Sequence, residues 1–164
     1  MSLWRACSAA LLACLLFFFL DGCGGGKKGK GDVMVLFTSD VHCGVDAGFG
    51  YAGLWQLRKQ LESEGYETIL VDAGDSIQGE PIGTLSRGAA VIELMNAMCY
   101  DVAVPGNHEF DYGVGRFLEL AGEASFPYVC CNFMKDGAPL LAPYVIREAA
   151  GLKIAFVGIT TPTT

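Results

Sequence analysis

The residues VMVLFTSDVH at positions 33–42 begin as an apolar run and end in polar side chains. The run at 33–38 is rich in β-branched and aromatic residues, which predicts a strand. Asp40 and His42 follow it two positions apart, so on extended backbone both side chains leave the same face. A carboxylate oxygen and an imidazole nitrogen placed in this way are suitable ligands for one divalent cation.

Two later segments repeat this arrangement of an apolar strand followed by a polar loop. TILV at 68–71 leads to Asp75, and DVAV at 101–104 leads to Asn107 and His108. The carboxyl ends of parallel strands meet at one edge of an open α/β sheet, where ligands collect. A single Asp or Asn at a strand end is more often a turn former or a helix cap. Three strand ends in succession that carry such residues, together with both histidines of the chain, favour a metal site.

Amphipathic segments lie between these strands. The alternation is typical of an α/β fold with a layered, largely parallel sheet and flanking helices. In the first such segment Leu54, Leu57 and Leu61 are spaced for one buried stripe, and in the second Met95 and Met98 are spaced as core residues. Helices are predicted at 51–64, 89–98 and 115–124, and further strands at 128–133, 144–147 and 153–159.

The amino terminus has the layout of a secretory signal. Arg5 precedes an apolar run over residues 6–20. That run is shorter than the roughly twenty residues that a transmembrane helix needs, so an exported protein is predicted in preference to one with a permanent membrane span.

The segment Leu20-Asp21-Gly22-Cys23 resembles the lipobox of bacterial lipoproteins, although Asp21 stands where that motif usually has a small residue. The resemblance implies lipidation of Cys23 and a protein held at the membrane by its lipid anchor, in the periplasm or at the cell surface. We therefore predict a signal peptide at 1–23, a Gly/Lys-rich tether at 24–31 and a folded part at 32–164. An ordinary signal peptide that leaves Cys23 as a free thiol is the alternative.

The net charge of the folded part excludes one class of partner. From residue 32 onward the chain has seven basic and seventeen acidic residues, a formal net charge of −10, which argues against nucleic-acid binding.

The four cysteines after the leader, Cys43, Cys99, Cys130 and Cys131, show no CxxC spacing. They are expected to fill the core, although an oxidising compartment permits one disulfide.

The motifs at 40–42, 74–75 and 106–109 (DVH, GD and GNHE) resemble the first three motifs of the calcineurin-like metallophosphoesterases. The longer string GNHEFDYG at 106–113 resembles the 5'-nucleotidase and 2',3'-cyclic-nucleotide phosphodiesterase branch of that family. The resemblance covers residues 33–164. It implies a hydrolase that acts on nucleotides or similar small phosphoesters.

The same resemblance implies a centre of two divalent metal ions, Mn, Zn or similar. Asp40 and His42 would hold one ion, Asp75 would bridge both, and Asn107 would bind the second. A bridged pair of cations lowers the pKa of a bound water and aligns it for attack on phosphorus.

His108 and Asp111 would form the catalytic dyad, with Asp111 orienting the imidazole. Family members complete both metal sites with three further histidines downstream and carry a carboxyl-terminal substrate domain that stacks on the nucleobase. No histidine follows His108 in this sequence. We therefore expect the amino-terminal part of a metallophosphoesterase domain, which by itself should bind metal poorly and have little or no turnover.

Two other functions fit parts of the sequence. A non-catalytic lipoprotein module, or an inactive fragment, would use the same polar residues merely to build loops. The segment at 48–53 (GFGYAG) fits the GxGxxG pattern of dinucleotide-binding folds, but that pattern requires glycine at the strand end. A long loop containing Asp40 and His42 intervenes in this chain, so no nucleotide cofactor is predicted.

Overall fold

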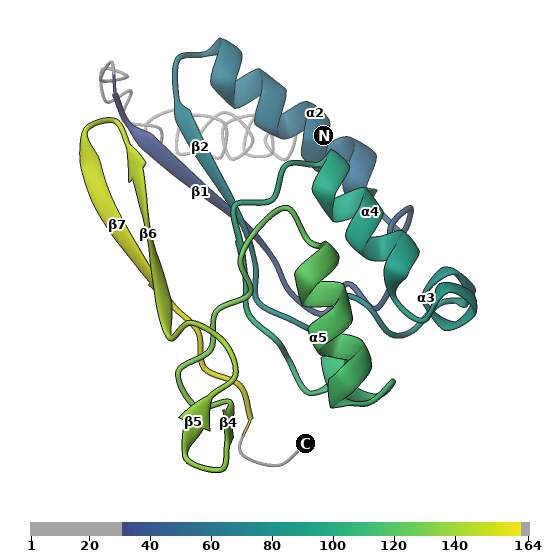
Figure 1. Ribbon diagram of the computed structural model, residues 1–164. Coiled ribbons are helices and arrows are strands. Elements are labelled where there is room, and N and C mark those ends of the chain that lie inside the picture. Colours follow the sequence, from purple (N-terminus) through teal and green to yellow (C-terminus); the bar gives the residue numbers. More distant parts are fainter. Residues whose placement is uncertain (1–30, 162–164) are drawn as a thin grey trace, which may run out of the picture.

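A parallel sheet forms the centre of the structure, a computed structural model that describes residues 31–161 (Figure 1). Its strand order is β1-β2-β3, and Val33 of β1 is in register with Glu67 of β2. The predicted signal peptide, Cys23 and all but the last residue of the predicted tether lie outside the described residues. The strands are β1 (Val33–Thr38), β2 (Glu67–Asp72) and β3 (Val102–Ala103).

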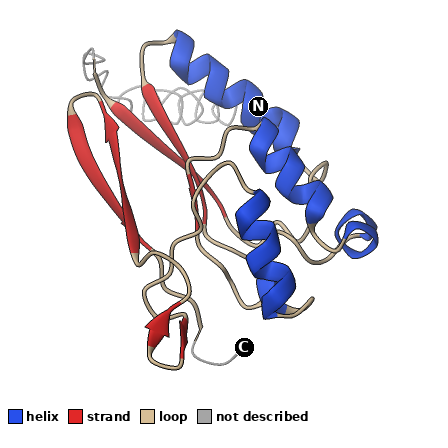
Figure 2. Cartoon of the chain, in the orientation of Figure 1, coloured by secondary structure: helices blue, strands red, loops and turns tan. Residues whose placement is uncertain are grey.

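The helices α2, α4 and α5 lie on one side of the strands (Figures 1 and 2). Each connects or follows parallel strands, as the crossover geometry of an α/β fold requires. The mixed α/β fold with a parallel sheet and flanking helices is therefore confirmed. Among the described residues no helix has the length and apolar character to cross a membrane. The helices are α2 (Gly50–Ser63), α3 (Pro81–Ser86), α4 (Ala89–Ala97) and α5 (Val114–Glu123), with a short 3₁₀ turn, η1 (His108–Phe110).

Two antiparallel hairpins follow α5 in the chain. The Arg147 guanidinium of the larger one donates to the carbonyl oxygen of Asp101 at 2.6 Å, which ties this hairpin to the start of β3. Figure 1 shows it on the side of β2 opposite the helices. The hairpins are β4 (Met134–Lys135) with β5 (Ala138–Pro139), and β6 (Tyr144–Ala149) with β7 (Leu152–Val157).

The core lies between the sheet and the helices. Met95 and Met98 both belong to it, as their spacing predicts. The expectation that the cysteines fill the core is wrong in part, because Cys43 and Cys130 are buried whereas Cys99 and Cys131 are exposed. All four are free thiols. The fully buried apolar residues include Leu70, Ile77, Val91, Ile92, Met95, Phe117, Leu120 and Val129.

The buried stripe predicted for α2 is wrong in part. Leu57 is 36% exposed, whereas the charged Arg58 beside it is only 8% exposed. The Arg58 guanidinium donates to the carbonyl oxygens of Met98 and Cys99 after α4, and it pairs with Asp101 at 3.2 Å. Burial of this charge is tolerated because several acceptors satisfy it, and sequence spacing does not reveal acceptors forty residues away.

The strand predicted at 128–133 is also wrong in part. Only two isolated bridges form there, between Tyr128 and Ala103 and between Val129 and Ala142. Beyond them the backbone changes partners, because the N–H of Cys131 donates to the carbonyl oxygen of Gly158. A segment that divides its hydrogen bonds among different partners does not extend into one regular ladder.

Candidate metal centre

Backbone hydrogen bonds join the loops that follow β1 and β2. The N–H of Asp40 donates to the carbonyl oxygen of Gly74 at 3.0 Å, and that of His42 donates to the carbonyl oxygen of Asp75 at 2.9 Å. The loop after β3 joins them, since the N–H of His108 donates to Asp75 Oδ1 at 2.8 Å. The three strand ends therefore meet at one edge of the sheet.

Three predicted site residues come together at this edge. Potential ligand atoms of His42, Asp75 and His108 all lie within 4.8 Å of one another. The two imidazole ring centroids are 5.0 Å apart, and the rings are steeply inclined to each other. A metal–ligand bond is about 2.1 Å long, so side chains gathered this closely can face a common cation site. Imidazole nitrogens and a carboxylate oxygen suit a divalent transition metal.

His42 is held by its own neighbour. Its Nδ1 lies 3.1 Å from the carbonyl oxygen of Gln78. A carbonyl can only accept, so Nδ1 carries the hydrogen and the lone pair of Nε2 remains available for a cation. A backbone partner of this kind fixes the tautomer and ring orientation of many metal-binding histidines. The sequence gives no sign of Gln78 as that partner, since a carbonyl oxygen is common to every residue.

Three side chains of this edge extend from strained backbone. Asp40, His42 and Asp75 have positive φ angles of 54°, 46° and 59°. The left-handed region costs a non-glycine residue about 1–2 kcal/mol. Such strain persists where surrounding contacts hold it, and it is concentrated at functional sites.

Two glycines permit the close approach of the loops. A Cβ on Gly106 would collide with Asp75 Oδ1, and a Cβ on Gly74 would collide with the backbone nitrogen of Gly106. The glycine before Asp75 and the glycine before Asn107 therefore let the Asp75 carboxylate lie against the backbone of the loop after β3.

The other two predicted ligands lie beside this group. Asp40 is exposed, and its carboxylate accepts a hydrogen bond from the Ser39 hydroxyl. It is not one of the three clustered ligands. Asn107 is exposed and immediately precedes His108 in the same loop.

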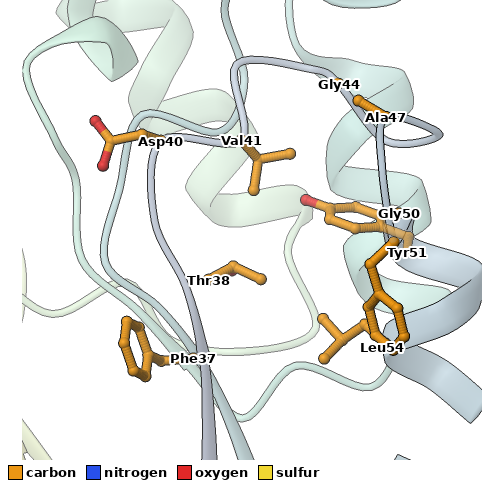
Figure 3. A pocket seen from close by; sticks show the side chains of 10 residues that line it. Phe37, Thr38, Asp40, Val41, Gly44, Ala47, Gly50, Tyr51 and Leu54 are labelled. Carbon is orange, nitrogen blue, oxygen red and sulfur yellow. The ribbon is translucent and has the colours of Figure 1, made fainter. Parts of the chain in front are cut away.

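Two hollows adjoin the site. One of about 370 Å³ lies between the end of β1 and the start of α2, and Figure 3 shows the Asp40 carboxylate at its edge, directed away from Val41 and the Tyr51 ring. His42, Asp75 and His108 do not line it. The other, of about 500 Å³, is lined by His42 and by residues of α3 and the loop before it. Of the three clustered residues, only His42 lines the second hollow.

His108 and Asp111 form the hydrogen-bonded pair that the sequence resemblance implies. Nδ1 of His108 lies 2.8 Å from Asp111 Oδ2, and both side chains are 38% exposed. The hydrogen bond to Asp111 raises the pKa of His108 above its ordinary value near 6.5, with a smaller contribution from the nearby negative charges. Nε2 is the ring nitrogen that this hydrogen bond leaves for other partners.

We expect Asp111→Asn to lower the midpoint at which His108 titrates in the metal-free chain. The amide keeps a hydrogen bond but loses the charge that favours the imidazolium. Proton NMR of the imidazole C–H signals against pH measures this midpoint, and Asp46→Asn, an exposed change in another loop, is the control. Equal midpoints in wild type and Asp111→Asn would show that the pair does not set the pKa.

The same pair makes stability depend on pH. The folded-state pKa of His108 is raised. The pair's contribution to the free energy of unfolding is therefore fully present below the pKa of His108 in the unfolded chain, about 6.5. It is lost as the pH rises through the pKa of His108 in the folded chain. Solvent screening keeps the contribution small, because neither side chain is buried.

Glu109 was assigned no role by the sequence motifs, yet it is fully buried between the loops. Its carboxylate accepts hydrogen bonds from backbone N–H groups of Gly106 and Asp75, both at 2.7 Å, and of Ser76 at 2.8 Å. Its place within the GNHE string was the only sequence signal. Burial depends on partners in a distant loop, so spacing could not reveal it.

Comparison with known proteins agrees with this geometry. The sequence model of the family described as calcineurin-like phosphoesterase matches residues 33–160. The 2',3'-cyclic-nucleotide 2'-phosphodiesterase/3'-nucleotidase of Haemophilus influenzae is 34% identical, over 82% of this chain and 25% of that protein. The human 5'-nucleotidase is 31% identical, over 83% of this chain and 27% of its own. The chain thus spans about a quarter of the length of these curated relatives.

Solved structures show the same fold. The calcineurin-like phosphoesterase YfkN of Bacillus subtilis has a TM-score of 0.68 at 29% identity, covering 78% of this chain and 48% of that one. A 5'-nucleotidase precursor of Thermus thermophilus has a TM-score of 0.67 at 27% identity, covering 78% of this chain and 28% of that one.

Proposed function

The chain belongs to the calcineurin-like phosphoesterase family, and we propose that it provides part of a two-metal centre that hydrolyses nucleotides or similar small phosphoesters. The observation that carries this proposal is the convergence of His42, Asp75 and His108 at the carboxyl ends of parallel strands. Relatives that carry nucleotidase and cyclic-nucleotide phosphodiesterase names support the substrate class.

The residues present fit divalent cations of the Mn or Zn kind. We propose that Asp40 and His42 hold one ion, that Asp75 bridges, and that Asn107 contributes to the second. Such ions, when bound, polarise phosphoryl oxygens and activate water. The hydrogen bond of His42 to Gln78 and the position of Asp75 against the β3 loop supply the orientation that this chemistry requires.

The dyad is proposed to move a proton. Asp111 holds the hydrogen on Nδ1 of His108, so Nε2 is the atom that exchanges a proton with substrate. The raised pKa of His108 favours the protonated ring, which can donate to phosphoryl oxygens or to a leaving alkoxide.

Two cations with four to six ligands each need more donors than these four side chains. We propose that further histidines, and a domain that binds the nucleobase, are supplied by polypeptide other than residues 1–164. Export to the periplasm or cell surface with a lipid on Cys23 is likewise a proposal, and it rests on residues 1–31 of the sequence alone.

Metal content tests the proposal. Equilibrium dialysis against Mn²⁺ at concentrations that load a weak site should find metal bound to the chain and a lower content in Asp40→Ala, because that change removes a proposed ligand of the first ion. Asp46→Ala, an exposed aspartate of the same loop, is the matched control and should bind as wild type does. A chain that binds no divalent metal at any concentration would instead be a non-catalytic module.

Hydrolysis of 5'-AMP and 2',3'-cyclic AMP tests whether outside ligands are needed. We expect turnover by this chain to stay near that of an Asp75→Ala variant. Turnover well above that level would show that residues 1–164 suffice for catalysis.

A further inference from the structure

Glu109 has no role in the chemistry proposed above, although it lies at the centre of the site. It is 0% exposed. One carboxylate oxygen, Oε2, accepts from the backbone of Asp75 and of Gly106, and the other, Oε1, accepts from the backbone of Ser76. The donors belong to two different loops, one after β2 and one after β3. A single side chain therefore joins the two loops that carry the bridging ligand and the dyad.

These hydrogen bonds explain why the carboxylate can be buried. An unpaired charge in a protein interior costs several kcal/mol, whereas short bonds from backbone N–H groups to a carboxylate are charge-assisted and strong. With both oxygens occupied in this way, Glu109 is not available as a metal ligand. Its effect on a cation must therefore come from its charge and from the residues that it holds, and not from coordination.

Asp75 is the residue held most directly. Its backbone N–H is fixed by Glu109 at 2.7 Å, and its Oδ1 is fixed by the N–H of His108 at 2.8 Å. Its φ of 59° lies in the left-handed region, which aspartate adopts more readily than most residues and which fixed backbone contacts help to maintain. Glu109 supplies such a contact on the main chain.

We infer that Glu109 is a positioning residue. Its buried carboxylate fixes the backbone of Asp75 and Gly106, and so orders the cation-binding loops before any cation arrives. This inference rests on the proposed function, because it concerns the same site. Partners that orient metal ligands typically contribute about 10- to 100-fold to metal affinity.

Glu109→Gln tests the inference with little change in shape. The amide replaces one acceptor oxygen by an NH₂ group, which then faces a backbone N–H donor. We expect the affinity for Mn²⁺, measured by calorimetry on the full chain, to fall by about 10- to 100-fold. The visible absorption spectrum of bound Co²⁺ should change as well, because the ligand geometry changes.

Asp101→Asn is the matched control. Asp101 Oδ2 also accepts from a backbone N–H, that of Leu70 at 2.8 Å, but it precedes β3 and so lies at the opposite end of the strand from the metal loops. This variant should keep the Mn²⁺ affinity and the Co²⁺ spectrum of wild type. If both variants lose affinity equally, general destabilisation is the cause and the positioning role is wrong. Wild-type affinity in folded Glu109→Gln would also overturn it.

Hydrogen exchange of the metal-free wild-type chain gives a test that needs no variant. The amides of Asp75, Ser76 and Gly106 should be protected as strongly as those of β2. Fast exchange there would mean that the loops are not ordered in advance. This measurement separates the two proposals: a chain that binds no metal yet protects these amides contradicts the proposed function and leaves the positioning role intact.

Discussion

Replacement of Asp75 by asparagine is expected to remove both proposed cations, whereas Asp40→Ala should remove one. Asp75 is the carboxylate at the centre of the cluster, and it is the proposed bridge. Asparagine keeps the oxygen that accepts from the His108 N–H but offers no negative charge and no second carboxylate oxygen for a bridge. The loss of affinity should exceed the roughly 10- to 100-fold effect of an outer partner. Elemental analysis and calorimetry with Mn²⁺ measure both quantities.

Asp136→Asn is a suitable control for this change. Asp136 also has positive φ, 51°, but it lies in the turn between β4 and β5. Asparagine tolerates the left-handed region as well as aspartate does, so the backbone should be unaffected at both positions. Retention of two cations by Asp75→Asn would contradict the bridging role. Equal loss in Asp136→Asn would mean that metal binds to surface carboxylates at large.

The meeting of His42 with Asp75 could be predicted because strand ends obey a simple rule. Apolar runs at 33–38 and 68–71 form neighbouring parallel strands, and their following loops meet. Hence Asp75 and His42, far apart in sequence, were expected together and lie together. The extended backbone assumed for Asp40 and His42 is wrong, since both have positive φ, and Asp40 lies outside the cluster.

The burial of two charged side chains could not be predicted, because it depends on hydrogen-bond partners that residue spacing does not reveal. Glu109 and Arg58 are charged, and composition alone favours exposure for both residue types. Each is buried because hydrogen-bond partners from a distant loop converge on it. The helix α3 was missed for a different reason, since six residues beginning at Pro81 contain too little periodicity to indicate a helix.

The largest effect on stability is expected from Phe117→Ala. Phe117 is 1% exposed on α5, and its ring meets Tyr128 and Phe110 in steep edge contacts with centroids 5.1 and 5.2 Å away. Truncation of a buried phenylalanine costs about 3–5 kcal/mol from lost transfer energy and the cavity left behind. Against a total stability of about 5–15 kcal/mol, that change removes much of the folded state's margin. Urea unfolding of the metal-free chain measures the difference.

Phe49→Ala provides the comparison, because Phe49 is 64% exposed and its removal should change stability by no more than about 0.5 kcal/mol. The contact of Phe117 with Phe110 also matters for the site, since Phe110 lies between His108 and Asp111 in the chain. A folded Phe117→Ala chain should therefore show a His108 titration midpoint nearer its ordinary value, because loss of the packing on Phe110 should loosen the turn that joins His108 to Asp111. A stability loss below about 1 kcal/mol, with an unchanged midpoint, would show that the aromatic cluster supports neither the core nor the dyad.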